Sequence, residues 1–157
     1  MNSQQKVIWI TGASSGIGAA LSKIYSRRGE KLILSSRREL ALEKIKSECD
    51  QPENISILTL DLNDFDAAAE TVKKAYEFFG SIDVIINNAG ISQRSLIVDT
   101  QFDVFKKLID VDYLGTIALS RAILPYCIEQ GSGHVVVVSS VMGKHGSPYR
   151  SGYAAAK

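Results

Sequence analysis

Tyr153 and Lys157 stand at the end of this 157-residue chain with types and spacing that could carry out chemistry. On a helix, residues four apart lie on one face, one turn from each other. An ammonium group beside a phenol stabilises the phenolate and lowers the pKa of a phenol from about 10. Such a phenol can give a proton to a carbonyl oxygen or take one from an alcohol. Alone, this pair usually means two surface residues, so its interpretation depends on the rest of the sequence.

A glycine-rich loop near the N-terminus could bind the phosphates of a nucleotide, and it reads Thr11-Gly12-Ala13-Ser14-Ser15-Gly16-Ile17-Gly18. Gly12 would permit a tight turn, Gly16 would leave room for a pyrophosphate, and Gly18 would let the helix pack close to the sheet. The N–H groups of the helix N-terminus would then face the phosphates. A tight turn without a ligand is the alternative, but the strand before the loop and the helix after it favour binding.

Two arginines, Arg37 and Arg38, follow the second expected strand, and the next carboxylate is Glu39. An NAD-binding protein usually has an acidic residue here, about 20 residues past the glycine loop, for the ribose 2′-hydroxyl. Guanidinium groups suit a 2′-phosphate because their planar fork donates two hydrogen bonds to it. A solvated pair at a helix start is the alternative, but it would oppose the helix dipole. We therefore expect NADP(H) rather than NAD(H), with Arg37 as the main contact.

The elements that must position these groups alternate between short apolar strands and longer helices. The expected strands cover residues 7–11, 31–36, 55–60, 82–86 and 134–139. The expected helices cover residues 17–28, 39–48, 64–79, 102–127 and the end of the chain from about 150. Asn63 or Asp64 would cap the third helix, and Gly29 and Gly80 would end the first and third. This order predicts one α/β domain over residues 1–157, a doubly wound parallel sheet with helices on both faces.

Composition excludes several classes of protein. Apolar residues make up 45% and charged residues 22%, and 18 basic against 17 acidic residues give a net charge of +1. This balance offers no field that would attract nucleic acid or an anionic membrane. No apolar run approaches the roughly 20 residues of a membrane helix, and no signal segment follows the N-terminus. Cys49 and Cys127 form neither a metal-binding nor a disulfide spacing, so we expect a cytoplasmic protein without a metal.

The loop spacing G-x-x-x-G-x-G after a threonine resembles the short-chain dehydrogenase/reductase family, and further motifs follow in the family's order. They are Asn87-Asn88-Ala89-Gly90, Ser139-Ser140 and Tyr153-Ala154-Ala155-Ala156-Lys157. The stretches 144–151 and 104–125 look most like its dehydrogenase/reductase member-seven branch, near the steroid dehydrogenases. The resemblance implies a Rossmann fold and an NADP(H)-dependent oxidoreductase that interconverts a carbonyl and a secondary alcohol by hydride transfer.

The resemblance also implies roles for individual residues. Tyr153 would act as acid and base, Lys157 would also bind the nicotinamide ribose, and Ser140, thirteen residues before Tyr153, would hold the substrate oxygen. Asp61 and Leu62 would lie at the adenine, although a turn cap is the alternative for Asp61. The residues implied along the adenine-side ribose and the middle of the cofactor are Asn88, Ala89 and Gly90.

Asp112 departs from the family pattern, because relatives usually carry Asn in the V-N-x-x-G motif of the long fourth helix. It falls on the apolar stripe with Phe105, Leu108 and Ile109, so its carboxylate is expected to face inward, which is costly unless it is paired. Asp112 would keep the family role of holding the lysine's water chain, or it would weaken catalysis. A helix irregularity that turns it to solvent is the third alternative.

Relatives continue beyond the tyrosine-bearing helix with two further strands and a loop that covers the substrate. A chain that stops at Lys157 is therefore expected to be a fragment or short isoform, inactive and marginally stable alone. The alternative function is a catalytically inactive nucleotide-binding module that acts in interaction or regulation. For the complete protein, the resemblance implies a small-molecule substrate and a homodimer or homotetramer. His134 and His145 lack a spaced partner, so neither is expected to act directly in catalysis.

Overall fold

Five parallel strands form a single sheet in a computed structural model that describes residues 5–157. The order across the sheet is β3-β2-β1-β4-β5. The strands are β1 (Val7–Thr11), β2 (Lys31–Ser36), β3 (Ile55–Thr59), β4 (Val84–Asn87) and β5 (His134–Val137). From β1, the next two strands along the chain are added on one side of the sheet, and β4 and β5 are then added on the other side. The carboxyl ends of β1 and β4 therefore flank the switch point where doubly wound sheets bind ligands.

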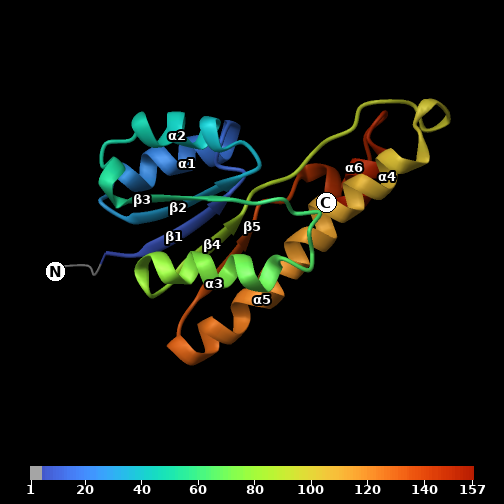
Figure 1. The fold of residues 1–157 in the computed structure, drawn as a ribbon. Coiled ribbons are helices and arrows are strands. Elements are labelled where there is room, and N and C mark those ends of the chain that lie inside the picture. Colours follow the sequence, from blue (N-terminus) through green and yellow to red (C-terminus); the bar gives the residue numbers. More distant parts are fainter. Residues whose placement is uncertain (1–4) are drawn as a thin grey trace.

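Helices cover both faces of this sheet, which confirms the predicted doubly wound α/β fold. Helices α1 (Gly16–Arg27) and α2 (Glu39–Ser47) lie on one face, and α3 (Ala68–Phe79) and α5 (Gly115–Gln130) lie on the other (Figure 1). Helix α4 (Phe102–Leu108) projects beyond the carboxyl edge of the sheet and contacts the short helix α6 (Ser151–Ala156). The projecting part therefore brings α6, with Tyr153, to the end of the sheet where the loops gather.

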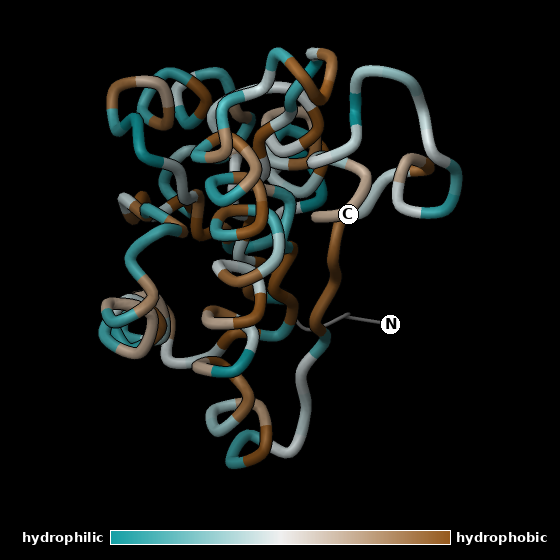
Figure 2. Tube along the Cα trace, turned by 90° about the vertical axis from the view of Figure 1, so that its right-hand side faces the viewer, coloured by the Kyte–Doolittle hydropathy of each residue, from teal (hydrophilic) through white to brown (hydrophobic). Residues whose placement is uncertain are grey.

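The core lies on both sides of β1, whose five residues are all buried. Trp9 contributes to one apolar cluster with α3 and α5, while Ile10 contributes to the other with α1 and α2. Both side chains are 0% exposed, and the Trp9 indole donates a hydrogen bond of 2.9 Å to Ser35 Oγ. Strand β5 lies at one edge of the sheet, and its trace is hydrophobic along most of its length (Figure 2). Its outward-facing Val137 remains 53% exposed.

The third helix begins at Ala68, four residues later than predicted. Asp61 Oδ1 accepts a hydrogen bond from Asn63 N, and Asp64 Oδ1 accepts one from Ala67 N. These side chains build turns before the helix, which is how aspartate competes with helical backbone bonding. The prediction that Asn63 or Asp64 caps the helix is therefore wrong, because the N-cap is Ala67 and no side chain caps it. The alternative role of Asp61 as a turn cap is therefore present in the structure.

Tertiary contacts shift other boundaries. Strand β4 begins at Val84 rather than 82, and Ile82 N donates to the side chain of Gln130 at the end of α5. The long fourth helix extends to Gln130 and contains a π-helical segment, Ile109–Leu114. Strands β3 and β5 end one and two residues before the predicted bounds. Gly80 ends α3 with a φ of 72°, as predicted. No helix within residues 5–157 is long and apolar enough to cross a bilayer.

Candidate active site

The glycine loop between β1 and α1 holds three glycines in three different environments. Gly12 has a φ of +65°, and a Cβ added there would lie 2.7 Å from the Cα of Ala89. A Cβ on Gly18 would lie 2.4 Å from the carbonyl oxygen of Gly12, so this helix does approach the loop closely. Gly16 has a φ of +55°, and an added Cβ there would meet no atom within 4 Å. The loop backbone is therefore tightly packed on one side and open at Gly16.

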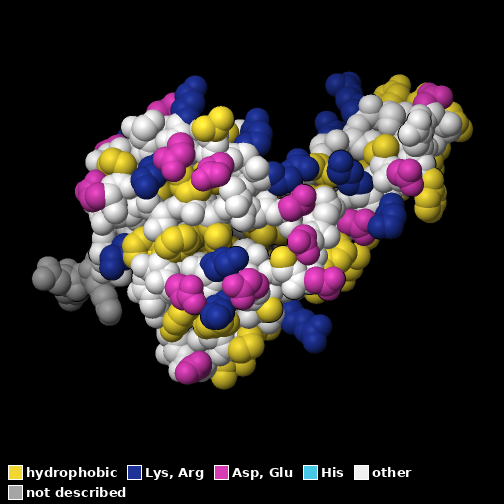
Figure 3. Space-filling model, viewed as in Figure 1, with side chains coloured by type: hydrophobic (Ala, Val, Ile, Leu, Met, Phe, Trp, Pro, Cys, Tyr) yellow, Lys and Arg dark blue, Asp and Glu magenta, His cyan; other side chains and the backbone are white. Residues whose placement is uncertain are grey.

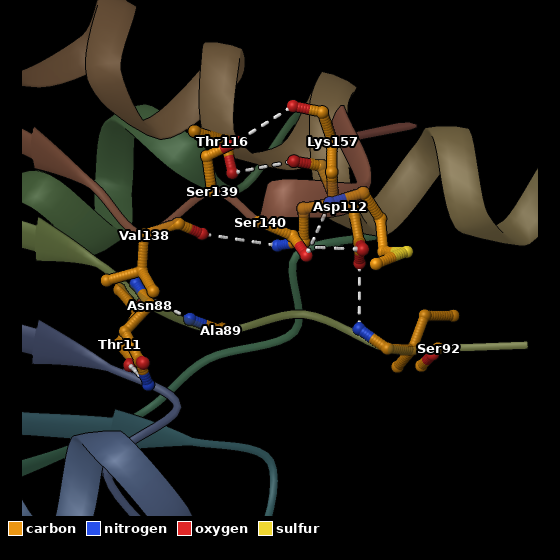
Figure 4. Close-up of polar contacts among 12 residues, drawn as sticks. Thr11, Asn88, Ala89, Ser92, Asp112, Thr116, Val138, Ser139, Ser140 and Lys157 are labelled. Carbon is orange, nitrogen blue, oxygen red and sulfur yellow. Dashed lines mark hydrogen bonds and ion pairs between the residues drawn. The ribbon is translucent and has the colours of Figure 1, made fainter. Parts of the chain in front are cut away.

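Thr11 and Asn88 join the carboxyl ends of β1 and β4 (Figure 4). Thr11 Oγ1 accepts hydrogen bonds from the backbone N–H groups of Asn88 and Ala89, each 3.0 Å long. The Asn88 amide donates in return to the carbonyl oxygens of Thr11 and Gly12. These bonds fix the glycine loop against the loop after β4. The sequence analysis placed Asn88 in the site but gave Thr11 no role. The position of Thr11 at the end of the first strand was the available clue.

A pocket of about 390 Å³ opens at the switch point between β1 and β4. It is lined by the loops that follow β1, β2, β3 and β4. The residues that line it are Gly12, Ser14, Ser15, Ile17, Ser36, Arg37, Arg38, Leu60, Asp61, Leu62, Asn88, Ala89, Gly90, Ile91 and Val111. Most predicted cofactor residues are thus brought together, whereas Gly16 and Gly18 are not among the lining residues. The Arg38 guanidinium also reaches the glycine loop, where it donates to Ser14 Oγ at 3.3 Å.

A second pocket of about 210 Å³ adjoins the first and contains the predicted catalytic pair. Its lining residues are Ile17, Asn88, Gly90, Ile91, Ser92, Val138, Ser139, Tyr153 and Lys157. Four of these also line the first pocket, so one ligand could occupy both. The molecular surface is hollowed between the body that carries α1 and α2 and the part that carries α4 and α6 (Figure 3).

Lys157 is held where three structural elements meet (Figure 4). Its ammonium group donates to the Val138 carbonyl oxygen at 3.4 Å and lies 3.7 Å from Asp112 Oδ2. Its Nζ is 6.0 Å from the centroid of the Tyr153 ring. Lys157 N donates to the Tyr153 carbonyl oxygen at 3.1 Å, which places the two residues one helical turn apart, as predicted. The lysine therefore links Tyr153 to both the segment after β5 and the long helix.

Asp112 points into the protein and is 5% exposed. Its Oδ1 accepts a hydrogen bond of 2.7 Å from Ile91 N, whereas its Oδ2 is buried without a hydrogen-bond partner. Burial raises the pKa of the Asp112 carboxyl, and the Ile91 N–H and the Lys157 ammonium reduce that increase. The alternative that a helix irregularity turns Asp112 to solvent is wrong. The π-helical irregularity is present, but Ile91 and Lys157 supply partners that offset the loss of hydration inside.

Gly90 leaves the space that Lys157 and Asp112 occupy. A Cβ on Gly90 would lie 2.9 Å from Lys157 Nζ and 3.2 Å from Asp112 Oδ1. Any larger residue here would press on the charged pair. Gly90 was predicted to lie along the cofactor. The structure adds a second reason for a glycine here, the space that Lys157 and Asp112 need, and the sequence did not reveal it.

The two serines after β5 have different surroundings. Ser139 lines the second pocket and donates to the Lys157 carbonyl oxygen at 2.9 Å. Ser140 is not among the lining residues, and its Oγ accepts a hydrogen bond from Met142 N at 3.2 Å. Because that bond uses an oxygen lone pair, the hydroxyl hydrogen of Ser140 remains available to a substrate oxygen. His134 and His145 are both exposed.

Several residues beside the pocket were not identified from the sequence. Ile91 and Val138 act through their backbones, so their side-chain types carry no signal. Ser92 lines the second pocket, and its Oγ accepts a hydrogen bond from Arg150. The Arg150 guanidinium carbon lies 5.6 Å from the centroid of the Tyr153 ring. The place of Arg150 three residues before Tyr153 was the available clue that it lies beside the pocket.

Comparison with known proteins agrees with this geometry. The family model described as short chain dehydrogenase matches residues 6–157. The chain is 43% identical to human "Dehydrogenase/reductase SDR family member 7" over 96% of this chain and 46% of the relative. It is 39% identical to the Drosophila melanogaster "Dehydrogenase/reductase SDR family protein 7-like" over 97% of this chain and 48% of the relative. The chain thus spans about half the length of these curated relatives.

Solved structures share the fold. A short-chain dehydrogenase from Streptomyces avermitilis superposes with a TM-score of 0.91 at 32% identity, over 100% of this chain and 57% of that chain. An alcohol dehydrogenase from Thermococcus sibiricus, solved with 5-hydroxy-NADP, gives a TM-score of 0.89 at 32% identity, over 98% of this chain and 66% of that chain. The five-stranded sheet and its helices are therefore an arrangement that these dehydrogenases also have.

Proposed function

Because the chain belongs to the short-chain dehydrogenase family, we propose that the protein is an NADP(H)-dependent oxidoreductase that interconverts a carbonyl compound and a secondary alcohol. The observation that carries this proposal is the meeting of Tyr153 and Lys157 in a pocket continuous with the glycine-loop pocket. Since the chain spans about half of its relatives, the proposed activity is that of the complete protein.

The residues around the larger pocket fit a dinucleotide. The open backbone at Gly16 gives a pyrophosphate access to the first turn of α1, where N–H groups lack helical partners. Arg37 and Arg38 line the same pocket and would bind a 2′-phosphate, which favours NADP(H) over NAD(H). Asp61 and Leu62 would lie toward the adenine, and Asn88, Ala89 and Gly90 toward the middle of the cofactor. When bound, NADP(H) would supply or accept the hydride.

The phenol of Tyr153 would transfer the proton that accompanies the hydride. In the reducing direction its hydroxyl gives a proton to the substrate oxygen, and in the oxidising direction its phenolate removes one. Lys157 would favour the phenolate electrostatically and would also hold the ribose. The Ser140 hydroxyl, whose hydrogen is free of the bond from Met142 N, would hold the substrate oxygen. Asp112 would position Lys157, since its carboxylate lies 3.7 Å from the ammonium group.

The test is the variant Tyr153→Phe in the natural protein that contains this sequence. Turnover of a panel of ketones and aldehydes with NADPH should fall by about 10²–10⁴-fold, the usual contribution of a general acid. The dissociation constant for NADPH should change little, because the lost hydroxyl mainly serves proton transfer.

Tyr126→Phe, a change on the opposite end of the fold in α5, is the matched control. Activity of Tyr153→Phe above about one-tenth of wild type, a loss of less than tenfold and thus well short of that range, would assign the chemistry to another group.

A further inference from the structure

Arg150 occupies a position fixed by the backbone on both sides. Its N–H donates to the Ser147 carbonyl oxygen at 3.3 Å, and its carbonyl oxygen accepts from Ala154 N at 2.8 Å. The preceding residue, Tyr149, has a φ of 65°, a conformation that non-glycine residues rarely adopt. The Tyr149 carbonyl oxygen accepts from Ser95 N at 3.0 Å, which ties this turn to the loop after β4. Arg150 is therefore held in place by the fold rather than extended from a free surface.

The side chain of Arg150 turns toward the pocket of the catalytic pair. Its Nη1 donates to Ser92 Oγ, and its guanidinium carbon lies 5.6 Å from the centroid of the Tyr153 ring. Ser92 and Tyr153 both line that pocket. The guanidinium group thus stands at the edge of the space in which a substrate would meet Tyr153.

The charges around this pocket leave Arg150 as an uncompensated cation. Lys157 is the charged residue in the pocket lining, and Asp112, at 3.7 Å, offsets its charge. None of the ion pairs found within residues 5–157 includes Arg150. A guanidinium carries five N–H donors, and the bond to Ser92 uses one of them. The remaining donors are suited to a carboxylate, which can accept two parallel hydrogen bonds from arginine.

We propose that Arg150 binds a carboxylate of the substrate, so that this site favours oxo acids and the corresponding hydroxy acids over neutral carbonyl compounds. The proposal rests on the proposed function, because it takes Tyr153 as the group that faces the reacting carbonyl. The carboxylate serves only to orient the substrate and is unchanged in the reaction. Hydride is added to the carbonyl carbon and a proton to its oxygen, which gives the hydroxy acid.

The experiment compares oxo acids of increasing chain length with their methyl esters, which keep the carbonyl and lose the charge. The natural protein that contains this sequence is tested as wild type, Arg150→Lys, Arg150→Met and the matched control Arg121→Met. Arg121 is an exposed arginine on α5. Two quantities are measured: the ratio of kcat/KM for acid and ester with NADPH, and the acid's dissociation constant in the presence of NADP⁺, where no reduction occurs.

We expect the wild type to prefer at least one acid over its ester, and Arg150→Met to reduce this ratio by about 10- to 100-fold, the usual contribution of a hydrogen bond to a charged group. Arg150→Lys should keep part of the preference, and Arg121→Met should keep all of it. The acid's dissociation constant should rise by a similar factor in Arg150→Met. Added salt should weaken the preference, because it screens a charge that is open to solvent.

Each failure has its own pattern. Turnover of neutral carbonyl compounds with no acid preference in wild type or Arg150→Met would overturn the role of Arg150 and leave the proposed function standing. An equal loss in Arg121→Met would also overturn it, because the effect would then follow net charge. Arg150-dependent binding of the acid without turnover of any carbonyl compound would support the anion site and refute the oxidoreductase function. Thermal melting of each variant tests whether Arg150→Met and Arg150→Lys are folded.

Discussion

Alanine substitutions at three glycines of one loop should separate backbone conformation from steric contact. Gly16→Ala changes only conformation, because its φ is +55° and the added Cβ meets no atom within 4 Å. Gly18→Ala changes only packing, because its Cβ would lie 2.4 Å from the Gly12 carbonyl oxygen. Gly12→Ala combines both effects, with a φ of +65° and a Cβ 2.7 Å from the Ala89 backbone. The three variants differ from wild type by the same methyl group.

The magnitudes follow from these environments. Holding alanine in the left-handed region costs about 1–2 kcal/mol, and the less flexible unfolded chain returns about 0.4–1 kcal/mol. Gly16→Ala should therefore lower the free energy of unfolding by about 1 kcal/mol. Gly18→Ala presses on backbone that cannot rotate away, which costs about 1–3 kcal/mol. Gly12→Ala should lose about 2–4 kcal/mol, the sum of this net conformational cost and the packing cost.

Urea unfolding followed by tryptophan fluorescence measures these differences, since the chain has a single tryptophan, Trp9, and it is 0% exposed. The free energy of unfolding should decrease most for Gly12→Ala and least for Gly16→Ala. The reasoning would be refuted if Gly16→Ala destabilised the chain as much as Gly12→Ala. It would also be refuted if Gly18→Ala were as stable as wild type.

Three further substitutions test the charged groups of the site. Arg37→Asp should reverse the proposed preference for NADPH over NADH in kcat/KM, and equal use of both by wild type would contradict the 2′-phosphate assignment. Burial raises the pKa of Asp112, so the folded state binds its proton more tightly and its stability should fall as pH rises from the ordinary value of 3.8 through the raised pKa. Asp112→Asn should remove this fall in the free energy of unfolding, measured with urea between pH 4 and pH 7. A larger fall in the variant than in wild type would contradict the raised pKa of Asp112. Gly90→Ala should displace Lys157 and lower kcat/KM about tenfold, with little change in Tm because the ammonium end is flexible; unchanged kcat/KM would show that Lys157 needs no fixed place.

Local sequence patterns determined the elements and the loops that line the larger pocket. Strands β1 and β2 matched their predicted bounds, because the middle of a strand buried on both faces is a continuous apolar run. The glycine spacing before α1 placed Gly12, whose positive φ the turn requires. Since the carboxyl ends of parallel strands lie at one edge, the residues after each strand meet in one pocket, as Arg37 and Asp61 do.

Only the tertiary structure decided which partners several polar side chains have. The apolar stripe predicted that Asp112 faces inward, but its partners, Ile91 N and Lys157, lie 21 and 45 positions away in the chain. Ser92 lies 58 residues before Arg150, so their hydrogen bond left no local pattern in the sequence. Periodicity shows which face of a helix is apolar, because that depends on neighbours along the chain. The partner of a charged group depends on which loops the sheet brings together, and that is known only once the chain is folded.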